Sequence, residues 1–157
     1  MPKNLKAAGL RGIMITYESL SADETFDLGE KLGETLKNGD IVALYGDLGA
    51  GKTVFAKGIA SGLGVSEEIT SPTFTLLKQY EGRLRLCHFD LYRIEDDEAL
   101  ENIGFYEYLG GEGVCVIEWA EKASLPLCIK VTLKGSGADS RSITIGKPEE
   151  RDADTCC

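Results

Sequence analysis

Apolar positions change their spacing several times along the chain, and each change predicts a different element. The runs at residues 41–45 and 114–117 are continuous and apolar, which is typical of strands buried on both faces. Apolar residues at helical spacing predict helices over residues 21–38, 53–63 and 95–109. Buried strands that alternate with helices favour an α/β fold with a mostly parallel sheet.

A second pattern predicts antiparallel strands as well. The segments at residues 73–80 and 84–89 flank a short turn at residues 81–83, and this arrangement resembles a β-hairpin. Two further strands are expected late in the chain, at residues 128–133 and 142–145. The sheet is therefore expected to be mixed.

The length of the chain fits a single domain. A chain of 157 residues can form one substantial core but is too short for two ordinary domains. We expect one domain at residues 14–147 and flexible extensions at residues 1–13 and 148–157. The first extension is basic, contains glycine and shows no clear periodicity.

A motif of eight residues stands between the strand at residues 41–45 and the helix that follows. It matches G-x-x-x-x-G-K-[ST] without a mismatch and reads Gly46-Asp47-Leu48-Gly49-Ala50-Gly51-Lys52-Thr53. A buried strand, a glycine-rich turn and a helix N-terminus, in this order, direct backbone N–H groups at phosphate oxygens. In such a P-loop, Lys52 reaches the β- and γ-phosphates and the Thr53 hydroxyl ligates Mg²⁺. A mobile turn is the alternative, but the position of the motif favours a three-layer fold of the P-loop NTPase type.

Two carboxylates are candidates for the rest of such a site. Hydrolysis at a P-loop also needs an acid near the metal and a group that orients water or a nucleophile. Glu118 ends the apolar run at residues 114–117, where an acid of the Walker B type would lie beside the P-loop. Asp90 ends another apolar strand in the same way. For each acid, a helix cap or a solvated strand edge is the alternative.

Four nearby residues each allow two interpretations. Thr73 lies in a turn that could sense the γ-phosphate or be only a turn. Trp119 could pack beside the nucleotide or be buried in the core. His88 precedes Asp90 by two positions and would share its strand face, but a lone histidine is more often a core residue than a catalyst. Arg93 could stabilise developing charge or pair with neighbouring acids.

Composition limits the partners that this chain can bind alone. The formal net charge of −9 and the pI near 4.7 argue against extensive unaided contact with nucleic acid, because neutralising phosphates requires a basic surface. Any RNA is expected to be held by another subunit, and no DNA partner is expected. No apolar stretch approaches the length of a membrane span. We therefore expect a cytoplasmic protein without a membrane partner.

The cysteines favour a reducing compartment. The chain has five cysteines, no C-x-x-C pair and a single histidine, so a structural zinc site is not expected. Cys87, Cys115 and Cys128 lie within apolar runs, where a reduced thiol behaves as a small hydrophobic group. This placement fits a cytosolic protein better than a disulfide framework.

Four motifs, taken in order, resemble those of the TsaE family, the bacterial P-loop ATPases required for threonylcarbamoyl modification of tRNA adenosine. They are the P-loop, Ser71-Pro72-Thr73-Phe74-Thr75-Leu76, His88-Phe89-Asp90-Leu91-Tyr92-Arg93 and Ile117-Glu118-Trp119. The P-loop alone is shared with many unrelated proteins, but the ordered set is highly specific. The similarity runs from about residue 15 to residue 145.

This resemblance implies a Mg²⁺-dependent ATPase that acts with two partner subunits, TsaB and TsaD. The complex transfers a threonylcarbamoyl group to the adenosine beside the anticodon, and the ATPase supports its repeated cycles. The tRNA would be contacted through the complex. ATP would be the substrate, and its hydrolysis is expected to be weak or to depend on the partners.

The resemblance also implies roles for single residues. Lys52, Asp90 and Glu118 would be catalytic, and Thr53 and Glu118 would hold Mg²⁺. Besides the P-loop, the residues implied to contact the nucleotide are Thr25 near the base, Thr73 in a switch segment, Asp90, Trp119 and Arg141.

Two other functions stay open. A nucleotide-gated binding module of the same complex would use bound ATP to order residues 72–80 and create a docking surface, with hydrolysis incidental. A small-molecule P-loop kinase would have a similar length but would need an arginine-rich lid over the phosphates. No clustered arginines follow the P-loop helix.

Overall fold

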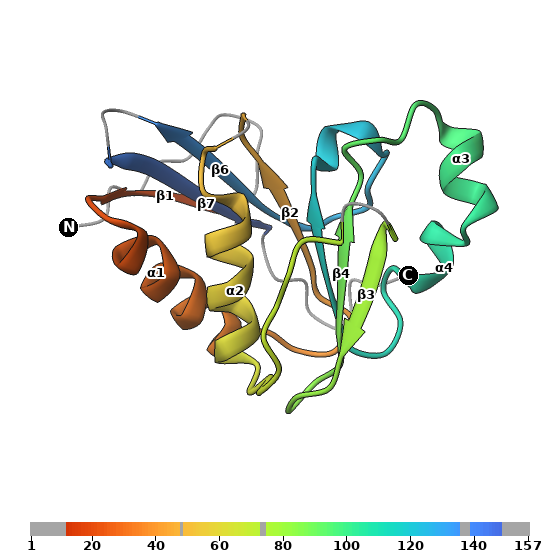
Figure 1. Cartoon of the computed structure of the whole chain (residues 1–157), viewed down its shortest axis with the longest axis horizontal. Coiled ribbons are helices and arrows are strands. Elements are labelled where there is room, and N and C mark those ends of the chain that lie inside the picture. The colour runs from red at the N-terminus through yellow and green to blue at the C-terminus, as the bar shows by residue number, and fades with distance from the viewer. Residues whose placement is uncertain (1–11, 48, 73–74, 136–138, 149–157) are drawn as a thin grey trace.

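The computed structural model describes residues 12–47, 49–72, 75–135 and 139–148. Its strands are β1 (Gly12–Ser19), β2 (Ile41–Tyr45), β3 (Leu77–Tyr80), β4 (Leu86–Asp90), β5 (Val114–Glu118), β6 (Ile129–Gly135) and β7 (Arg141–Pro148). Its helices are α1 (Ala22–Thr35), α2 (Lys52–Gly62), α3 (Asp97–Asn102), α4 (Phe105–Tyr108) and the short 3₁₀ helix η1 (Ala120–Lys122). The strands form one sheet in the order β1-β7-β6-β2-β5-β4-β3 (Figure 1).

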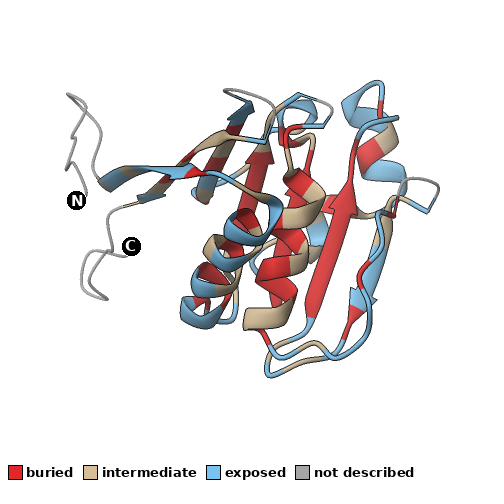
Figure 2. Cartoon of the chain, turned by 60° about the vertical axis from the view of Figure 1, so that its left-hand side comes forward, coloured by how far each residue is buried: buried red, intermediate tan, exposed pale blue. Residues whose placement is uncertain are grey.

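The centre of the sheet is parallel and its two ends are antiparallel. β6, β2, β5 and β4 run in one direction, whereas β3 joins β4, and β7 and β1 join β6, by antiparallel pairing. Every residue of β4 and β5 is buried. β1, in contrast, is mostly exposed, as Figure 2 shows. The predicted α/β fold with a mixed sheet and a parallel centre is confirmed.

Helices cover both faces of the sheet and make the fold three-layered. Side chains of a strand point alternately to the two faces, so neighbouring residues of β2 enter different cores. Val42 packs in the core that includes Phe55 of α2 and residues of α1. Ala43 packs in the opposite core with Phe89 of β4 and Phe105 of α4. The strands that lead to the candidate site are thus held from both sides.

Glycines allow α1 and α2 to pack with their backbones in close contact. A Cβ added to Gly58 would come well within 3.0 Å of the backbone oxygen of Phe26, a distance that real Cβ atoms essentially never show. A Cβ added to Gly29 would meet the backbone oxygen of Phe55 in the same way. The glycines with such contacts are Gly29 and Gly33 on α1 and Gly58 and Gly62 on α2. Because α2 starts in the P-loop, this contact fixes the helix that carries Lys52.

The predicted hairpin is confirmed, and the three described cysteines fit the sequence interpretation. β3 and β4 pair antiparallel, with Tyr80 opposite Leu86. Cys87, Cys115 and Cys128 are free and buried. The pair Cys156-Cys157 lies outside the described residues.

Two elements differ from the prediction. β1 was not predicted as a strand. It lies at the sheet edge with only β7 beside it. Its exposed apolar residues, such as Ile13 and Tyr17, hide the alternation of apolar and polar positions that would indicate a strand. The helix expected at residues 95–109 is instead two short helices, α3 and α4. Gly104, with a φ of +73°, separates them, and this left-handed conformation cannot continue a right-handed helix.

The domain limits of residues 14 and 147 stay a prediction. β1 and β7 pair from Gly12 to Pro148, slightly beyond those limits. Residues 1–11 and 149–157 lie outside the described part of the chain. Within the described part, none of the helices has the length and apolar character that crossing a membrane would need.

Gly58→Ala tests the close contact of α1 and α2. Alanine is favoured over glycine inside a helix by about 1 kcal/mol, but the new methyl group would press on the rigid backbone of α1. We expect the clash to dominate and to lower the free energy of unfolding by about 1–3 kcal/mol in urea denaturation.

Gly111→Ala is the matched control for this substitution. A Cβ on Gly111 would make only an ordinary contact, 3.7 Å from the oxygen of Tyr108, so its effect should stay within about 0.5 kcal/mol. A Gly58→Ala variant as stable as the parent would mean that the clash costs no more than the roughly 1 kcal/mol that alanine gains in a helix, and would contradict the expected dominance of the clash.

Candidate nucleotide site

The predicted site residues meet because three strands are parallel neighbours. The register places Leu44 of β2 opposite Glu118 of β5, and Glu118 opposite Asp90 of β4. The P-loop follows β2 directly, so the loop and the two acids lie at one edge of the sheet. The carboxyl ends of parallel strands are where open α/β sheets bind their ligands.

A cavity of about 470 Å³ opens at this edge, beside the N-terminus of α2. Eight of the predicted site residues line it: Gly49, Gly51, Lys52, Thr53, Asp90, Glu118, Trp119 and Arg141. The cavity thus combines two cationic side chains with two carboxylates. Cations suit phosphate oxygens and carboxylates suit a divalent cation, so the lining fits a nucleotide bound together with a metal ion.

The ammonium group of Lys52 is held by the P-loop itself. Its Nζ donates hydrogen bonds to the backbone oxygen of Gly46 and, at 3.0 Å, to that of Asp47. The same atom lies 4.1 Å from the centroid of the Trp119 ring, within the range of a cation–π interaction. Burial lowers the pKa of Lys52, and the nearby carboxylate of Glu118 opposes this effect. A phosphate group that binds Lys52 has to compete with these contacts.

Trp119 has a backbone conformation that is unusual for a residue other than glycine. Its φ is +60°, a left-handed conformation that costs on the order of 1–3 kcal/mol. The turn directs the chain from β5 into η1, and the ring packs against Tyr92 at a centroid distance of 5.0 Å. Trp119 is half-buried and lines the cavity, so it is not simply a core residue.

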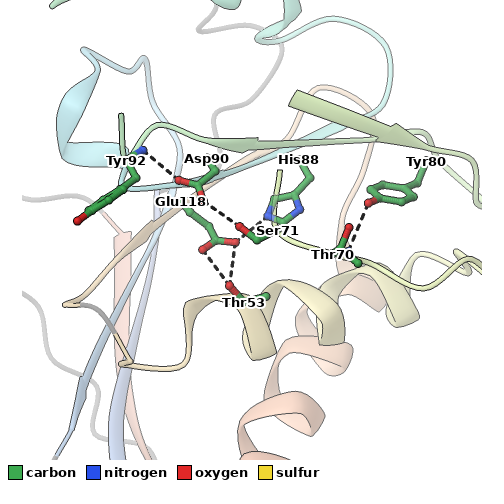
Figure 3. Close-up of polar contacts among 8 residues, drawn as sticks. All are labelled: Thr53, Thr70, Ser71, Tyr80, His88, Asp90, Tyr92 and Glu118. Carbon is green, nitrogen blue, oxygen red and sulfur yellow. Dashed lines mark hydrogen bonds and ion pairs between the residues drawn. The ribbon is translucent and has the colours of Figure 1, made fainter. Parts of the chain in front are cut away.

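Thr53, Glu118 and His88 form a continuous polar chain (Figure 3). The Thr53 hydroxyl donates to both carboxylate oxygens of Glu118, at 3.2 and 3.4 Å. His88 Nε2 lies 2.8 Å from Glu118 Oε2. Mg²⁺ prefers oxygen ligands, and a hydroxyl and a carboxylate this close together supply them. The pair that the sequence assigned to Mg²⁺ therefore fits the ion chemically.

Asp90 has other partners at the same edge. Its Oδ2 accepts a hydrogen bond from the Ser71 hydroxyl at 3.0 Å, and its Oδ1 accepts one from the backbone of Tyr92 at 3.0 Å. Figure 3 shows Asp90 and Glu118 side by side with these partners. Asp90 thus joins the cavity to the segment that leads into residues 72–80.

Three other P-loop residues face a second hollow. Gly46, Asp47 and Ala50 line a space of about 330 Å³ together with residues 132–135 of β6. Gly46 has a φ of +151°, and a Cβ there would come within 2.7 Å of the Leu133 oxygen. The P-loop therefore passes directly against β6.

Three predicted nucleotide contacts are not among the described residues that line these two hollows, and their roles stay predictions. Thr25 is buried, and its hydroxyl lies 2.7 Å from that of Ser19, which links α1 to β1. Leu48 and Thr73 are outside the described residues.

Sequence reasoning missed several residues at this cavity. Ser71, Tyr92 and Val54 also line it, and His88 contacts Glu118 directly. The spacing of His88 and Asp90 by two positions signalled a shared strand face, and β4 confirms it. No pattern of neighbouring residues in the sequence indicates that His88 contacts Glu118, which lies thirty positions away.

Comparison with known proteins identifies the family. Residues 19–143 match the family model described as threonylcarbamoyl adenosine biosynthesis protein TsaE. This chain belongs to the TsaE family. The resemblance based on the four motifs is therefore confirmed.

Individual members of the TsaE family are similar over most of their length. The tRNA threonylcarbamoyladenosine biosynthesis protein TsaE of Treponema pallidum is 47% identical over 130 residues, which cover 81% of this chain and 96% of that protein. The protein of the same name from Bacillus subtilis is 42% identical over 134 residues, 83% of this chain and 84% of that protein. The crystal structure of Bacillus subtilis YdiB superposes with a TM-score of 0.75 at 35% identity and covers 87% of each chain.

Trp119 offers a direct test of this site, since it is the only tryptophan and lies over Lys52. ADP should change the tryptophan emission in a saturable way, because a phosphate group that binds Lys52 would displace the ammonium group from the ring. Lys52→Ala should weaken ADP binding by about 10- to 100-fold, the usual effect of losing a charged hydrogen bond.

Lys57→Ala is the control for this titration, because it removes the same charge from α2 at a residue that does not line the cavity. It should bind ADP like the parent. If Lys52→Ala bound ADP with the parental affinity and showed the parental change in emission, Lys52 would be excluded as a phosphate contact.

Proposed function

We propose that this chain is a Mg²⁺-dependent ATPase of tRNA threonylcarbamoyladenosine biosynthesis. The observation that carries the proposal is one cavity lined by the P-loop lysine, Thr53, Glu118 and Asp90 in a chain of the TsaE family. The names of its relatives refer to that pathway. The cytoplasm is the proposed place of action.

Each residue of the cavity has its own role in ATP hydrolysis, the transfer of the γ-phosphoryl group to water. Lys52 leaves its carbonyl partners and binds the β- and γ-phosphates together with backbone N–H groups of the P-loop. Thr53 and Glu118 would hold Mg²⁺, and the ion would supply positive charge to the phosphate oxygens. Asp90, beside Glu118 at the end of β4, orients the attacking water on the γ-phosphate side. Trp119 and Arg141 close the pocket around the nucleotide.

The proposed partners are the TsaB and TsaD subunits, with tRNA contacted through the complex. The net charge of −9 supports this arrangement, since an acidic protein repels the phosphates of tRNA. ATP turnover by this chain would return the complex to its starting state after each modification. Hydrolysis by the isolated chain is expected to be slow.

A second candidate is a nucleotide-gated binding module, and the contact between Ser71 and Asp90 favours it. This hydrogen bond joins a cavity carboxylate to the segment that enters residues 72–80. A nucleotide that changes the position of Asp90 would therefore act on that segment without hydrolysis. The two candidates differ in whether turnover is needed.

Glu118→Gln separates hydrolysis from binding. The amide keeps the size of the side chain but lacks the charge for a metal ion. We expect ATP hydrolysis, measured with and without TsaB and TsaD, to fall by about 100-fold or more, while ADP affinity without Mg²⁺ stays close to that of the parent. Asp90→Asn should also slow hydrolysis and spare nucleotide binding.

Glu112→Gln is the control, because Glu112 is exposed just before the other end of β5. It should hydrolyse ATP at the parental rate. Normal rates of tRNA modification over many cycles with Glu118→Gln would favour the gated module. Full multi-turnover modification by purified partners without this chain would contradict both candidates.

A further inference from the structure

His88 occupies a position where an apolar side chain would be expected. It lies in the middle of β4, is 0% exposed, and follows the buried Leu86 on the same strand face. Its Nδ1 is buried and, among the described residues, has no hydrogen-bond partner. Burying an unpaired polar nitrogen costs free energy, and leucine at this position would avoid the cost. A histidine here needs a reason other than core packing.

The reason lies at the other ring nitrogen. His88 Nε2 is 2.8 Å from Oε2 of Glu118, a residue that is itself only 3% exposed. A carboxylate only accepts hydrogen bonds, so Nε2 carries the hydrogen and donates it. Nδ1 is the ring nitrogen that has no hydrogen-bond partner among the described residues. Within the described residues, the one side-chain hydrogen bond of His88 therefore goes to Glu118.

Two donors from different elements hold the Glu118 carboxylate. Thr53 approaches from α2 and His88 from β4 (Figure 3). The Thr53 hydroxyl would also serve a bound cation, so its contact with Glu118 changes when the cation binds. The contact from His88 involves Glu118 alone and can persist. A glutamate side chain loses rotational entropy when it is fixed. A donor that stays bound to Glu118 fixes the carboxylate before the ion binds, so metal binding itself costs less entropy.

We propose that His88 is a positioning residue that fixes the carboxylate of Glu118, so that Glu118 and Thr53 present their oxygens together to Mg²⁺. This inference rests on the proposed function, because it assumes that these two residues hold the ion. Partners that orient metal ligands commonly change metal affinity by about 10- to 100-fold. The effect of His88 should therefore appear in metal binding rather than in the fold.

The test measures how much Mg²⁺ tightens ADP binding. Calorimetry gives the Kd of ADP in EDTA and in Mg²⁺, and the ratio of the two values isolates the metal contribution. His88→Leu removes both the donor and the unpaired Nδ1. We expect its ratio to fall by about 10-fold or to reach one, while its Kd in EDTA stays within about threefold of the parent. His88→Gln, which keeps an N–H donor, should recover part of the ratio.

Leu86→Ala is the matched control on the same face of β4. It should lower the melting temperature by leaving a cavity and yet keep the parental ratio. Should the leucine variant fail to fold, His88→Met takes its place, because methionine adapts to irregular space.

Two outcomes would overturn the inference. One is a parental ratio in the apolar variant, which includes an equal loss of ADP affinity with and without Mg²⁺. The other is an equal ratio in the apolar and glutamine variants. If Mg²⁺ fails to tighten ADP binding even in the parent, the proposed metal site itself is wrong. A parental ratio in the variant alone refutes only the role of His88.

Discussion

The parallel pairing of β2, β5 and β4 is the constraint on which the candidate site depends. It aligns Leu44, Glu118 and Asp90 in one row, and the P-loop starts one residue after β2 ends. A slip of one residue in β5 would turn Glu118 to the opposite face of the sheet, away from Thr53 and His88. The burial of β5 on both faces makes such a slip costly, because packing specifies the register.

The glycine contact between α1 and α2 gives the site its second fixed part. A hydrogen bond of 3.2 Å between Thr53 and Glu118 requires the start of α2 to keep its distance from the end of β5. Side chains between two helices can adjust, but backbones in direct contact have little room to shift. Thr25 adds to this support, because its hydroxyl contact with Ser19 joins the start of α1 to β1. The sheet supplies the acids and the helix pair supplies the P-loop residues.

The features that could be predicted from the sequence are those with a local cause. Strands β2 and β5 are continuous apolar runs because they are buried on both faces. The P-loop is recognisable because loops of this type draw their phosphate-binding groups from consecutive residues. β1 escaped prediction because most of its residues are exposed and leave no clear alternation of apolar and polar positions. The contact of His88 with Glu118 escaped it because that contact depends on which strands are neighbours and on their register, and a single sequence does not display either.

The two halves of the cavity differ in how their side chains are held. Thr53 and Glu118 already stand together, with His88 behind them. Lys52, in contrast, is bound to P-loop carbonyls and to the face of Trp119. In the proposed nucleotide complex, a phosphate group would have to release Lys52 from these contacts, and the cost of release would subtract from its affinity. Coupling between two positions is reciprocal, so whatever moves Trp119 also changes how readily Lys52 meets phosphate.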